Sequence, residues 1–333
     1  MNNMDKIVSW FQLSFPNLVH SMKQTSHHGK EYFSLNPYHL EGDVFCHTMM
    51  VCKQAENLSE PLQLAALLHD VGKPSCREQS SDKKVHFYGH EGMSAIMTRD
   101  ILHQYGNTIS NKDLQLIIEI IALHTEPFKL SEKELTKRMV NNKNLMDSLL
   151  AVNRADQAGR FSFNGNDVKQ FEEPRDIYPE QEQTLECIMY IGLPCSGKST
   201  LANTYGKPVL SRDTILEENT IGSNYNEKFQ KADQRSIDKL FQKQLSELIR
   251  NKESFVVDKT NLSRKSRRRV LSQLPKHYKK TAVVCMPRFS EILRRNGERH
   301  HKHLDIKTIE YMAKRFYPPL YDEFDSISWN FDS

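Results

Sequence analysis

The sequence lacks the segments that would place it in or across a membrane. None of its apolar runs reaches the roughly 18 residues that a membrane-spanning helix needs. Its first ten residues lack a basic stretch followed by an apolar one, so no signal peptide is expected. The six cysteines form no C-x-x-C pair, which favours reduced thiols over a disulfide framework. These absences predict a cytoplasmic globular protein without a membrane partner.

A large excess of one charge is also missing, but the charge is unevenly distributed. The net charge is only +4. From residue 186 onward, 27 Lys and Arg stand against 18 Asp and Glu, whereas residues 166–185 are acidic. A basic region of this kind can follow a polyanion such as a nucleic acid. Ordinary surface charge accounts for the same count, so charge alone does not decide between the two.

Apolar spacing divides the chain into two regions. Up to about residue 160, apolar residues recur at three- and four-residue intervals, which predicts helices, and strand patterns are sparse. From residue 186 onward, short apolar runs alternate with helical patterns, which predicts a parallel sheet covered by helices on both faces. A polar stretch with turn residues separates the two regions. We therefore predict a multidomain protein, with an all-α domain at 1–165, a linker at 166–185 and an α/β domain at 186–333.

The same patterns predict individual elements. Helices are expected in the first region at 47–57, 61–70, 92–105, 112–124 and 143–157. Short strands are expected in the second region at 187–191, 208–210, 255–257 and 281–286. A long amphipathic helix is expected at 229–250.

Histidines and aspartates in the first region follow an order that suggests a metal centre. Both residue types are ligands of the divalent metals used in hydrolysis, and two such metals can clamp both oxygens of a displacement at phosphorus. Adjacent residues such as His69 and Asp70 can reach one site only where a helix ends, and Gly72 and Pro74 favour an end there. A single histidine is most often a surface or capping side chain, but a larger set predicts metal binding. The set is His47, His69, Asp70, His90, His124 and Asp156.

The motifs around these residues resemble the HD phosphohydrolase superfamily, especially the HD domains attached to CCA-adding enzymes. The matching segments are 45–48 (FCHT), 68–74 (LHDVGKP), 89–95 (GHEGMSA), 123–124 (LH) and 155–160 (ADQAGR). The resemblance implies one or two divalent metals, drawn from Mn²⁺, Co²⁺, Ni²⁺, Fe²⁺ and Mg²⁺, with Asp70 as the shared ligand. The first metal would be held by His47, His69, Asp70 and Asp156, and the second by Asp70, His90 and His124.

Three residues near this set are candidates for substrate contact. The resemblance implies that Lys73, one turn past His69 and Asp70, faces the substrate phosphate; a plain surface lysine is the alternative. His39 and Glu41 come shortly before His47 and would line the pocket, with a role in the loop as an equal alternative.

A glycine-rich loop follows the first apolar run of the second region. Residues 192–199 have the sequence GLPCSGKS, which fits the G-x-x-x-x-G-K-[ST] pattern between a strand and a helix. In that pattern the backbone N–H groups face the phosphates, Lys198 reaches the β- and γ-phosphate oxygens, and Ser199 binds Mg²⁺. The expected cofactors are therefore ATP and Mg²⁺. The residues expected to bind them are Gly192, Ser196, Gly197, Lys198, Ser199, Thr200 and Asp258.

Candidate residues for phosphate transfer follow the later strands. Asp213 comes directly after the second strand, where a parallel sheet opens to ligands, and it is the candidate general base; a helix cap is the alternative role. Arg295 and Arg299 are four residues apart, so they would share one helical face and reach over the triphosphate, unless they form a solvated basic face. The expected catalytic residues are Asp213, Lys198, Arg295 and Arg299 for transfer, and Asp70 and Lys73 for hydrolysis.

The second region resembles the polynucleotide kinase branch of the P-loop phosphotransferases. The shared motifs are the glycine-rich loop, SRD at 211–213, DKTNLSRKSRR at 258–268 and RNGER at 295–299. One position departs from the pattern. Many relatives have an arginine three residues after the aspartate, where it grips a phosphate of the acceptor, and this chain has Leu216. The residues expected to bind substrate are Arg212, Arg264, Arg267, Arg268 and His39.

The order of the two regions resembles the HD–polynucleotide kinase enzymes of nucleic-acid end repair. That resemblance implies an enzyme that phosphorylates 5′-OH ends and processes 3′-phosphate or 2′,3′-cyclic phosphate ends of RNA or DNA, with a separate RNA ligase as a candidate partner. A small-molecule kinase fused to an HD nucleotidase is the alternative, and Leu216 slightly favours it. An ATP-regulated RNA-binding module without catalysis is a third alternative, which the intact motifs disfavour.

Overall fold

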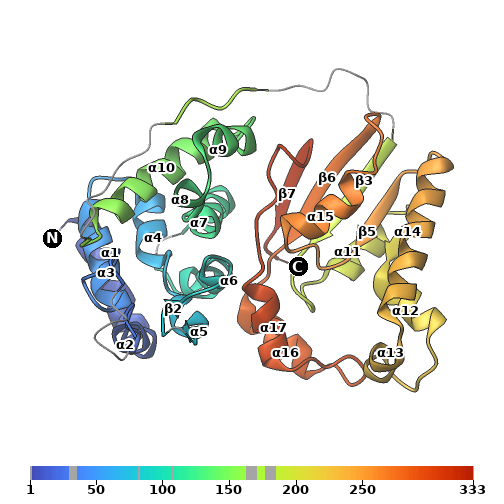
Figure 1. Ribbon diagram of the computed structural model, residues 1–333, viewed down its shortest axis with the longest axis horizontal. Coiled ribbons are helices and arrows are strands. Elements are labelled where there is room, and N and C mark those ends of the chain that lie inside the picture. The colour runs from blue at the N-terminus through green and yellow to red at the C-terminus, as the bar shows by residue number, and fades with distance from the viewer. Residues whose placement is uncertain are drawn as a thin grey trace. The chain divides into compact units, whose positions relative to one another are not determined.

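A computed structural model describes residues 2–29, 36–81, 83–106, 108–162, 171–176 and 185–332. The chain forms two compact units (Figure 1). The N-terminal unit comprises Met1–Asp176 and Ala313–Tyr317, and the C-terminal unit comprises Ile177–Met312 and Pro318–Ser333. Of the predicted linker at 166–185, residues 171–176 form neither helix nor strand, residue 185 begins a strand, and the rest lies outside the described residues. No helix among the described residues is long and apolar enough to cross a membrane.

The N-terminal unit is helical, as predicted. Helices α3, α4, α6, α7 and α10 lie at the five predicted positions, and α4 and α7 form much of its interior, because residues 63–68 and 117–123 are all buried. The strands β1 (Glu78–Gln79) and β2 (Val85–His86) form one short antiparallel pair. The helices are α1 (Asn3–Ser14), α2 (Pro16–Gln24), α3 (Val44–Gln54), α4 (Glu60–Leu68), α5 (Lys73–Cys76), α6 (His90–His103), α7 (Asn111–Leu123), α8 (Glu126–Lys129), α9 (Glu132–Arg138) and α10 (Lys143–Ala158).

The C-terminal unit contains a five-stranded sheet, which is parallel, as predicted. Its strand order is β4-β5-β3-β6-β7 (Figure 1), and each neighbouring pair runs parallel. Four of the strands match the predicted apolar runs. The fifth, β7, was not predicted, because its residues are only partly buried or exposed and do not form an apolar run. The strands are β3 (Leu185–Ile191), β4 (Val209–Ser211), β5 (Phe255–Asp258), β6 (Tyr278–Cys285) and β7 (Ser326–Asn330).

Seven helices connect or follow these strands in the described part of the unit. The prediction of a single helix at 229–250 is wrong, because the end of α13 and the whole of α14 lie in this segment. Asp233 lies between them in an extended conformation and caps α14, since its side chain accepts a hydrogen bond from the N–H of Arg235. The helices are α11 (Lys198–Thr204), α12 (Arg212–Asn219), α13 (Tyr225–Lys231), α14 (Gln234–Arg250), α15 (Arg264–Leu271), α16 (Phe289–Gly297) and α17 (Ile306–Ala313).

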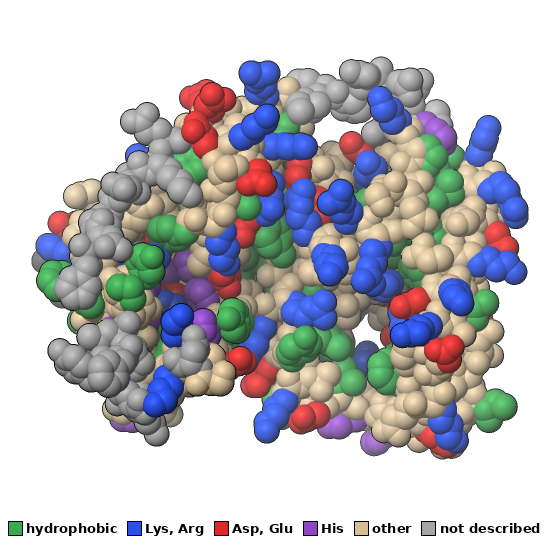
Figure 2. All heavy atoms as spheres, in the orientation of Figure 1, with side chains coloured by type: hydrophobic (Ala, Val, Ile, Leu, Met, Phe, Trp, Pro, Cys, Tyr) green, Lys and Arg blue, Asp and Glu red, His purple; other side chains and the backbone are tan. Residues whose placement is uncertain are grey.

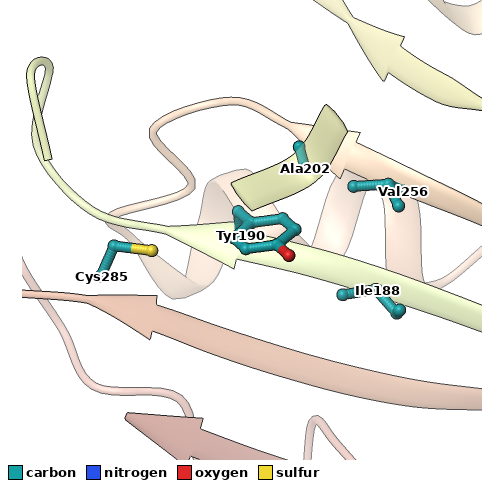
Figure 3. Close-up of a cluster of buried hydrophobic side chains, with 5 residues drawn as sticks. All are labelled: Ile188, Tyr190, Ala202, Val256 and Cys285. Carbon is teal, nitrogen blue, oxygen red and sulfur yellow. The ribbon is translucent and has the colours of Figure 1, made fainter. Parts of the chain in front are cut away.

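A buried cluster holds α11 against the sheet directly behind the glycine-rich loop. The cluster consists of Ile188 and Tyr190 of β3, Val256 of β5, Ala202 of α11 and Cys285 at the end of β6 (Figure 3). Interiors of this kind are close-packed and resist displacement. The cluster therefore fixes where α11 begins, and with it the position of the loop between β3 and α11.

Candidate metal centre and phosphate-transfer site

Three histidines of the N-terminal unit are held in the same way. In each, the ring Nδ1 donates a hydrogen bond to the backbone carbonyl three residues earlier, so that Nε2 is the ring nitrogen that faces Asp70; the Nε2 atoms of His90 and His124 also lie 3.2 Å from each other. Two of them stand directly after the last residue of a helix, which confirms that α4 ends before the His-Asp pair. The pairs are His69 with Ala66 (2.8 Å), His90 with Phe87 (2.8 Å) and His124 with Ile121 (2.7 Å).

The Asp70 carboxylate lies between the Nε2 atoms of these three histidines. Its Oδ2 is 3.2 Å from His69 Nε2, and its Oδ1 is 3.3 Å from His90 Nε2 and 3.8 Å from His124 Nε2. His47 Nε2 lies 3.8 Å from Asp70 Oδ2. Asp70 therefore has one oxygen toward each half of the predicted ligand set, which is the arrangement of a carboxylate shared by two metals.

Asp156 completes the set from α10. Its Oδ1 lies 3.1 Å from His47 Nε2. Arg160, one helical turn later, donates to both oxygens of Asp156, from Nε at 3.1 Å and from a terminal nitrogen at 2.9 Å. This fork fixes the orientation of the carboxylate. No role was predicted for Arg160, although its i, i+4 spacing from Asp156 is typical of an ion pair on a helix.

The chemistry of the set fits divalent metal ions. Within the described residues, His47 Nε2, His69 Nε2 and both oxygens of Asp70 are buried and make no hydrogen bond of normal geometry, although Lys73 Nζ lies 2.7 Å from Asp70 Oδ2 and Asp156 Oδ1 lies 3.1 Å from His47 Nε2. Buried polar atoms are rarely left without full pairing, and divalent cations among them would supply it. Two sets have all their ligand atoms within 4.8 Å of one another, His47–His69–Asp70 and Asp70–His90–His124. Nitrogen and carboxylate donors in such sets are typical ligands of divalent metal ions.

Protonation also favours metal binding. Burial raises the pKa of the Asp70 carboxyl, but His69 and Lys73 outweigh that effect and hold its pKa well below the usual range. Burial and the neighbouring His90 and His69 lower the pKa of His124 to about 3. Asp70 and His124 are thus in the forms that coordinate metals, whereas Asp156 and Glu41 outweigh burial and raise the pKa of His47, which must lose its proton to bind a metal.

The outer part of this site contains a second group of polar side chains. Lys73 is buried, with Nζ 2.7 Å from Asp70 Oδ2 and 3.1 Å from His27 Nε2, so it is not a plain surface lysine. His39 stacks on His27 with ring centroids 4.2 Å apart, and Glu41 Oε1 lies 2.8 Å from His39 Nδ1 and 2.9 Å from Nδ1 of the ligand candidate His47. His27 was not predicted, because the pair His27-His28 lies in a polar segment and matches no motif.

A cavity of about 400 Å³ opens beside this centre, and Figure 2 shows histidine side chains grouped there among charged ones. The cavity is lined both by candidate metal ligands and by the positively charged side chains of Lys73 and Arg160, so a substrate in it would lie beside both. The lining residues include His39, Asp70, Lys73, His124, Asp156 and Arg160.

In the C-terminal unit, the glycine-rich loop is closed by backbone geometry that needs glycine. Gly197 has a φ of 86°, which favours glycine, and it stands directly before α11. At Gly192, an added Cβ would lie 2.5 Å from the Cys285 carbonyl oxygen, so only glycine fits. Lys198 Nζ folds back over the loop and donates to the Leu193 carbonyl at 2.6 Å. The loop therefore leads directly into the N-terminus of α11, where backbone N–H groups can bind a phosphate, and it holds the lysine ammonium beside it.

The donor and acceptor candidates lie around one cavity of about 520 Å³. Ser199 Oγ donates to Asp258 Oδ2 at 2.6 Å, so the predicted magnesium ligand Ser199 is in contact with Asp258, which was predicted to bind the cofactor. Asp213 lies in the first turn of α12, which begins at Arg212, but Ser211 provides the cap, since its hydroxyl accepts from the N–H of Thr214. The cavity is lined by the loop residues 194–200 and by Arg212, Asp213, Asp258, Lys259, Arg299 and Lys302, among others.

Asp213 is held as an ionised carboxylate. Its Oδ2 is 2.6 Å from Lys302 Nζ, and its Oδ1 accepts from the Tyr225 hydroxyl at 2.8 Å. Burial raises the pKa of Asp213, but Lys302 and the Tyr225 hydrogen bond outweigh it, so the pKa lies below its usual value. An ionised carboxylate can accept a proton, as a general base must.

Comparisons with known proteins agree with this geometry. A family model of the HD domain matches residues 44–158, and a family model of the AAA domain matches residues 187–319. The chain carries an HD domain followed by an AAA-type P-loop domain. The Multifunctional CCA protein of Pasteurella multocida (strain Pm70) is 30% identical over 149 residues, which cover 40% of this chain and 34% of that protein. The chain thus spans about a third of the length of this curated relative.

A solved structure was also compared with the chain. It is described as that of a proposed kinase from Chloroflexus aurantiacus J-10-fl, and it is 17% identical. The match covers 45% of this chain and 90% of that one, with a TM-score of 0.36. A TM-score this low supports no argument about fold or activity.

One arginine of the P-loop domain, Arg267, is not placed to bind a nucleic acid, and the prediction for it is corrected. Arg267 is fully buried; it donates to Glu323 at 2.6 Å and to the carbonyls of Asn261 and Pro318. Arg264 is ion-paired with Asp322. Both therefore fasten α15 to the segment that precedes β7. Arg268 is exposed, and Arg212 lines the cavity while paired with Asp238.

The prediction that Arg295 and Arg299 share one helical face is wrong. α16 ends at Gly297, so Arg295 is helical and Arg299 lies beyond the helix, and the two do not share a helical face. Arg295 donates to the Cys195 carbonyl of the glycine-rich loop at 3.3 Å, and Arg299 lines the cavity. Leu216 is fully buried in α12, so a side chain at this position does not face the cavity.

The burial of Arg267 gives a stability prediction. Arg267→Ala should lower the free energy of unfolding of the P-loop domain by about 3–5 kcal/mol, because it removes the nearer of two cations from the buried carboxylate of Glu323 and leaves only Arg264, at 3.5 Å. Arg268→Ala, one residue along and exposed, should change it by less than about 0.5 kcal/mol. Denaturant unfolding of both variants measures the difference. Equal stabilities would mean that the Arg267–Glu323 pair contributes nothing.

Proposed function

We propose that this chain is a bifunctional enzyme that heals nucleic-acid ends, with a 5′-OH polynucleotide kinase in the P-loop domain and a phosphoesterase for 3′-phosphate or 2′,3′-cyclic phosphate ends in the HD domain. One observation carries the kinase part. The carboxylate of Asp213, ionised and free of any capping role, lines the same cavity as Lys198 of the glycine-rich loop. A phosphate-donor site and a candidate base for a hydroxyl therefore face one space.

The residues around this cavity have distinct roles in the proposed transfer. Lys198 and the loop N–H groups bind the β- and γ-phosphates of ATP, and Ser199 and Asp258 would hold Mg²⁺, which neutralises phosphate charge when bound. Asp213 accepts the proton of the 5′-OH. The 5′-oxygen of the acceptor bonds to the γ-phosphorus while the bond from that phosphorus to ADP breaks and ADP leaves. Arg299, which lines the cavity, can balance the charge that develops on the transferred group.

In the HD domain, the proposed reaction is hydrolysis of a phosphate ester. The two ligand sets that share Asp70 would hold divalent cations, which supply Lewis-acid activation of water and of the phosphate when bound. Lys73 and Arg160 line the cavity beside them and carry the positive charge that a phosphate substrate requires. Lys73 is held beside the ligand set by its contact with Asp70, and Arg160 by its contact with Asp156.

A nucleic-acid substrate accounts for the two activities together. RNA broken to leave a 5′-OH and a 2′,3′-cyclic phosphate cannot be sealed until both ends are processed, and a separate RNA ligase would then act. The similarity to part of a CCA protein supports a nucleic-acid substrate. The rival proposal, a small-molecule kinase joined to an HD nucleotidase, is favoured only by the buried Leu216, which offers no grip on an acceptor phosphate.

The acceptor can be identified directly. γ-labelled ATP is incubated with 5′-OH oligonucleotides and, separately, with mononucleosides. Labelling of oligonucleotides well above mononucleosides is the expected result, because cations such as Arg212, Lys259 and Lys302 around the cavity can contact several backbone phosphates. Equal labelling of both would favour the small-molecule kinase, and labelling of neither would favour a binding module without catalysis.

Asp213→Asn tests the proposed base. The substitution keeps the shape of the side chain and removes the proton acceptor, so the rate of 5′-phosphorylation should fall by on the order of 10²–10⁴. The KM for ATP should change little. Glu218→Gln is the matched control, since it removes an exposed carboxylate from the same helix. If Asp213→Asn works at the wild-type rate, the carboxylate is not the base.

A further inference from the structure

Helix α13 presents two aromatic side chains to the cavity of the P-loop domain. Tyr225 and Phe229 are one helical turn apart, and their rings stack with centroids 6.1 Å apart and an interplanar angle of 29°. Both line the cavity. No residue of α13 is buried, and Phe229 is 46% exposed. An apolar ring left open at the edge of a cavity lined with charged groups is suited to a flat ligand.

Tyr225 shows which side of the cavity this is. Its hydroxyl donates to Asp213 at 2.8 Å, and Lys302 Nζ lies 3.8 Å from its ring centroid. Its polar end and one ring face are therefore already engaged beside the proposed base. The ring of Phe229 next to it remains open. The open aromatic face accordingly lies on the acceptor side, next to the carboxylate that would meet the 5′-OH.

α13 is also fixed in place by neighbours on both sides. Asn226 donates to the His303 carbonyl at 3.0 Å, and Lys228 donates to the Glu217 carbonyl of α12 at 2.5 Å. His303 is in turn held by Asn296 of α16, since its Nδ1 lies 2.9 Å from the Asn296 carbonyl. A ring on a fixed helix loses little freedom when a ligand stacks on it, which strengthens binding.

We propose that Phe229 is the surface on which the terminal base of the acceptor stacks, and that Tyr225 is a positioning residue that supports Phe229 and orients Asp213. This inference rests on the proposed kinase function. Stacking on an aromatic ring tolerates every base, because each has a π-face. The acceptor class is therefore a chain that ends in a nucleoside of any base. A sugar acceptor without a base would not use this surface.

The test compares two acceptors and needs no variant to begin. One is a 5′-OH oligonucleotide with an ordinary 5′-terminal base, and the other is the same oligonucleotide with an abasic 5′-terminal residue. Wild-type enzyme should phosphorylate the first with a kcat/KM about 5- to 150-fold higher, the factor that corresponds to about 1–3 kcal/mol of base stacking. Phe229→Ala should remove this preference by lowering only the first value, and Phe229→Trp should retain it. Ile221→Ala, which removes an exposed apolar side chain outside the cavity, should change neither value.

The possible failures are distinguishable. If the wild-type enzyme phosphorylates no oligonucleotide, the proposed kinase function is wrong. If it phosphorylates both acceptors equally well, the kinase function stands and the stacking surface is wrong. If Phe229→Ala raises the KM for ATP and leaves the acceptor preference intact, Phe229 contacts the donor instead, and the inference is overturned. For Tyr225→Phe, loss of the hydroxyl should change the pH dependence of kcat and leave the acceptor preference unchanged, because only its contact with Asp213 is removed.

Discussion

Lys198→Ala should lower phosphate transfer from ATP by on the order of 10²–10³ or more, the usual cost of removing a positioned donor from developing charge. The ammonium of Lys198 is buried in the loop with Nζ on the Leu193 carbonyl and on Ser196 Oγ, at 2.6 and 3.3 Å, and no solvent-exposed lysine could take its place. Phosphoesterase activity should stay near the wild-type level, because its proposed ligands belong to the HD domain. Transfer from γ-labelled ATP and release of 3′-phosphate, measured on the same preparation, give the two values.

Lys207→Ala is the matched control for this variant. Lys207 is exposed, follows α11 by three residues and does not line the cavity, so its loss should affect neither activity. Loss of both activities in a folded Lys198→Ala protein would contradict the assignment of the two reactions to separate sites.

Asp70→Ala should remove most of the bound metal and reduce phosphoesterase activity by more than about 100-fold, beyond the 10- to 100-fold typical of an outer-shell contact. Its carboxylate is the group that both ligand sets share, so neither set remains complete without it. Metal analysis of the wild-type protein should give more than one ion per chain. Kinase activity should be unchanged.

Asp147→Ala controls for the loss of a carboxylate, since Asp147 is exposed on α10, the helix that carries Asp156. A second substitution tests the number of metals. If His124→Ala retains a full metal content, His124 is a core or substrate-contacting residue and the centre holds fewer ions than proposed.

The sequence predicted the parts of both sites that depend on local pattern. A helix that ends at Leu68 puts His69 and Asp70 at one point, and the Gly and Pro residues that follow were sufficient to predict that end. The glycine-rich loop was predicted in the same way, because its spacing between strand and helix is itself the requirement for phosphate binding. The coming together of His47, His90 and Asp156 was implied only by the order of the motifs.

The failures concern contacts between segments far apart in the chain. Arg267 and Arg268 are adjacent in one basic run, and only the partner Glu323, 56 residues after Arg267, decides that the first is buried. The same holds for Lys302, which reaches Asp213 across 89 positions and was not predicted. The end of α16 was a different kind of error, because Asn296-Gly297 is a recognisable stop that should have placed Arg299 beyond the helix.

The strand order of the P-loop domain also determines when its cavity can form. The glycine-rich loop follows β3 and Asp213 follows β4, but these two strands are not hydrogen-bonded to each other, since β5 lies between them. β5 comes about 44 residues after the end of β4, and it also carries Asp258. During folding, the glycine-rich loop and Asp213 are therefore not brought together by the sheet until β5 has paired with both β3 and β4. Non-local pairing of this kind slows folding, so the kinase site should be among the last parts of the domain to become ordered.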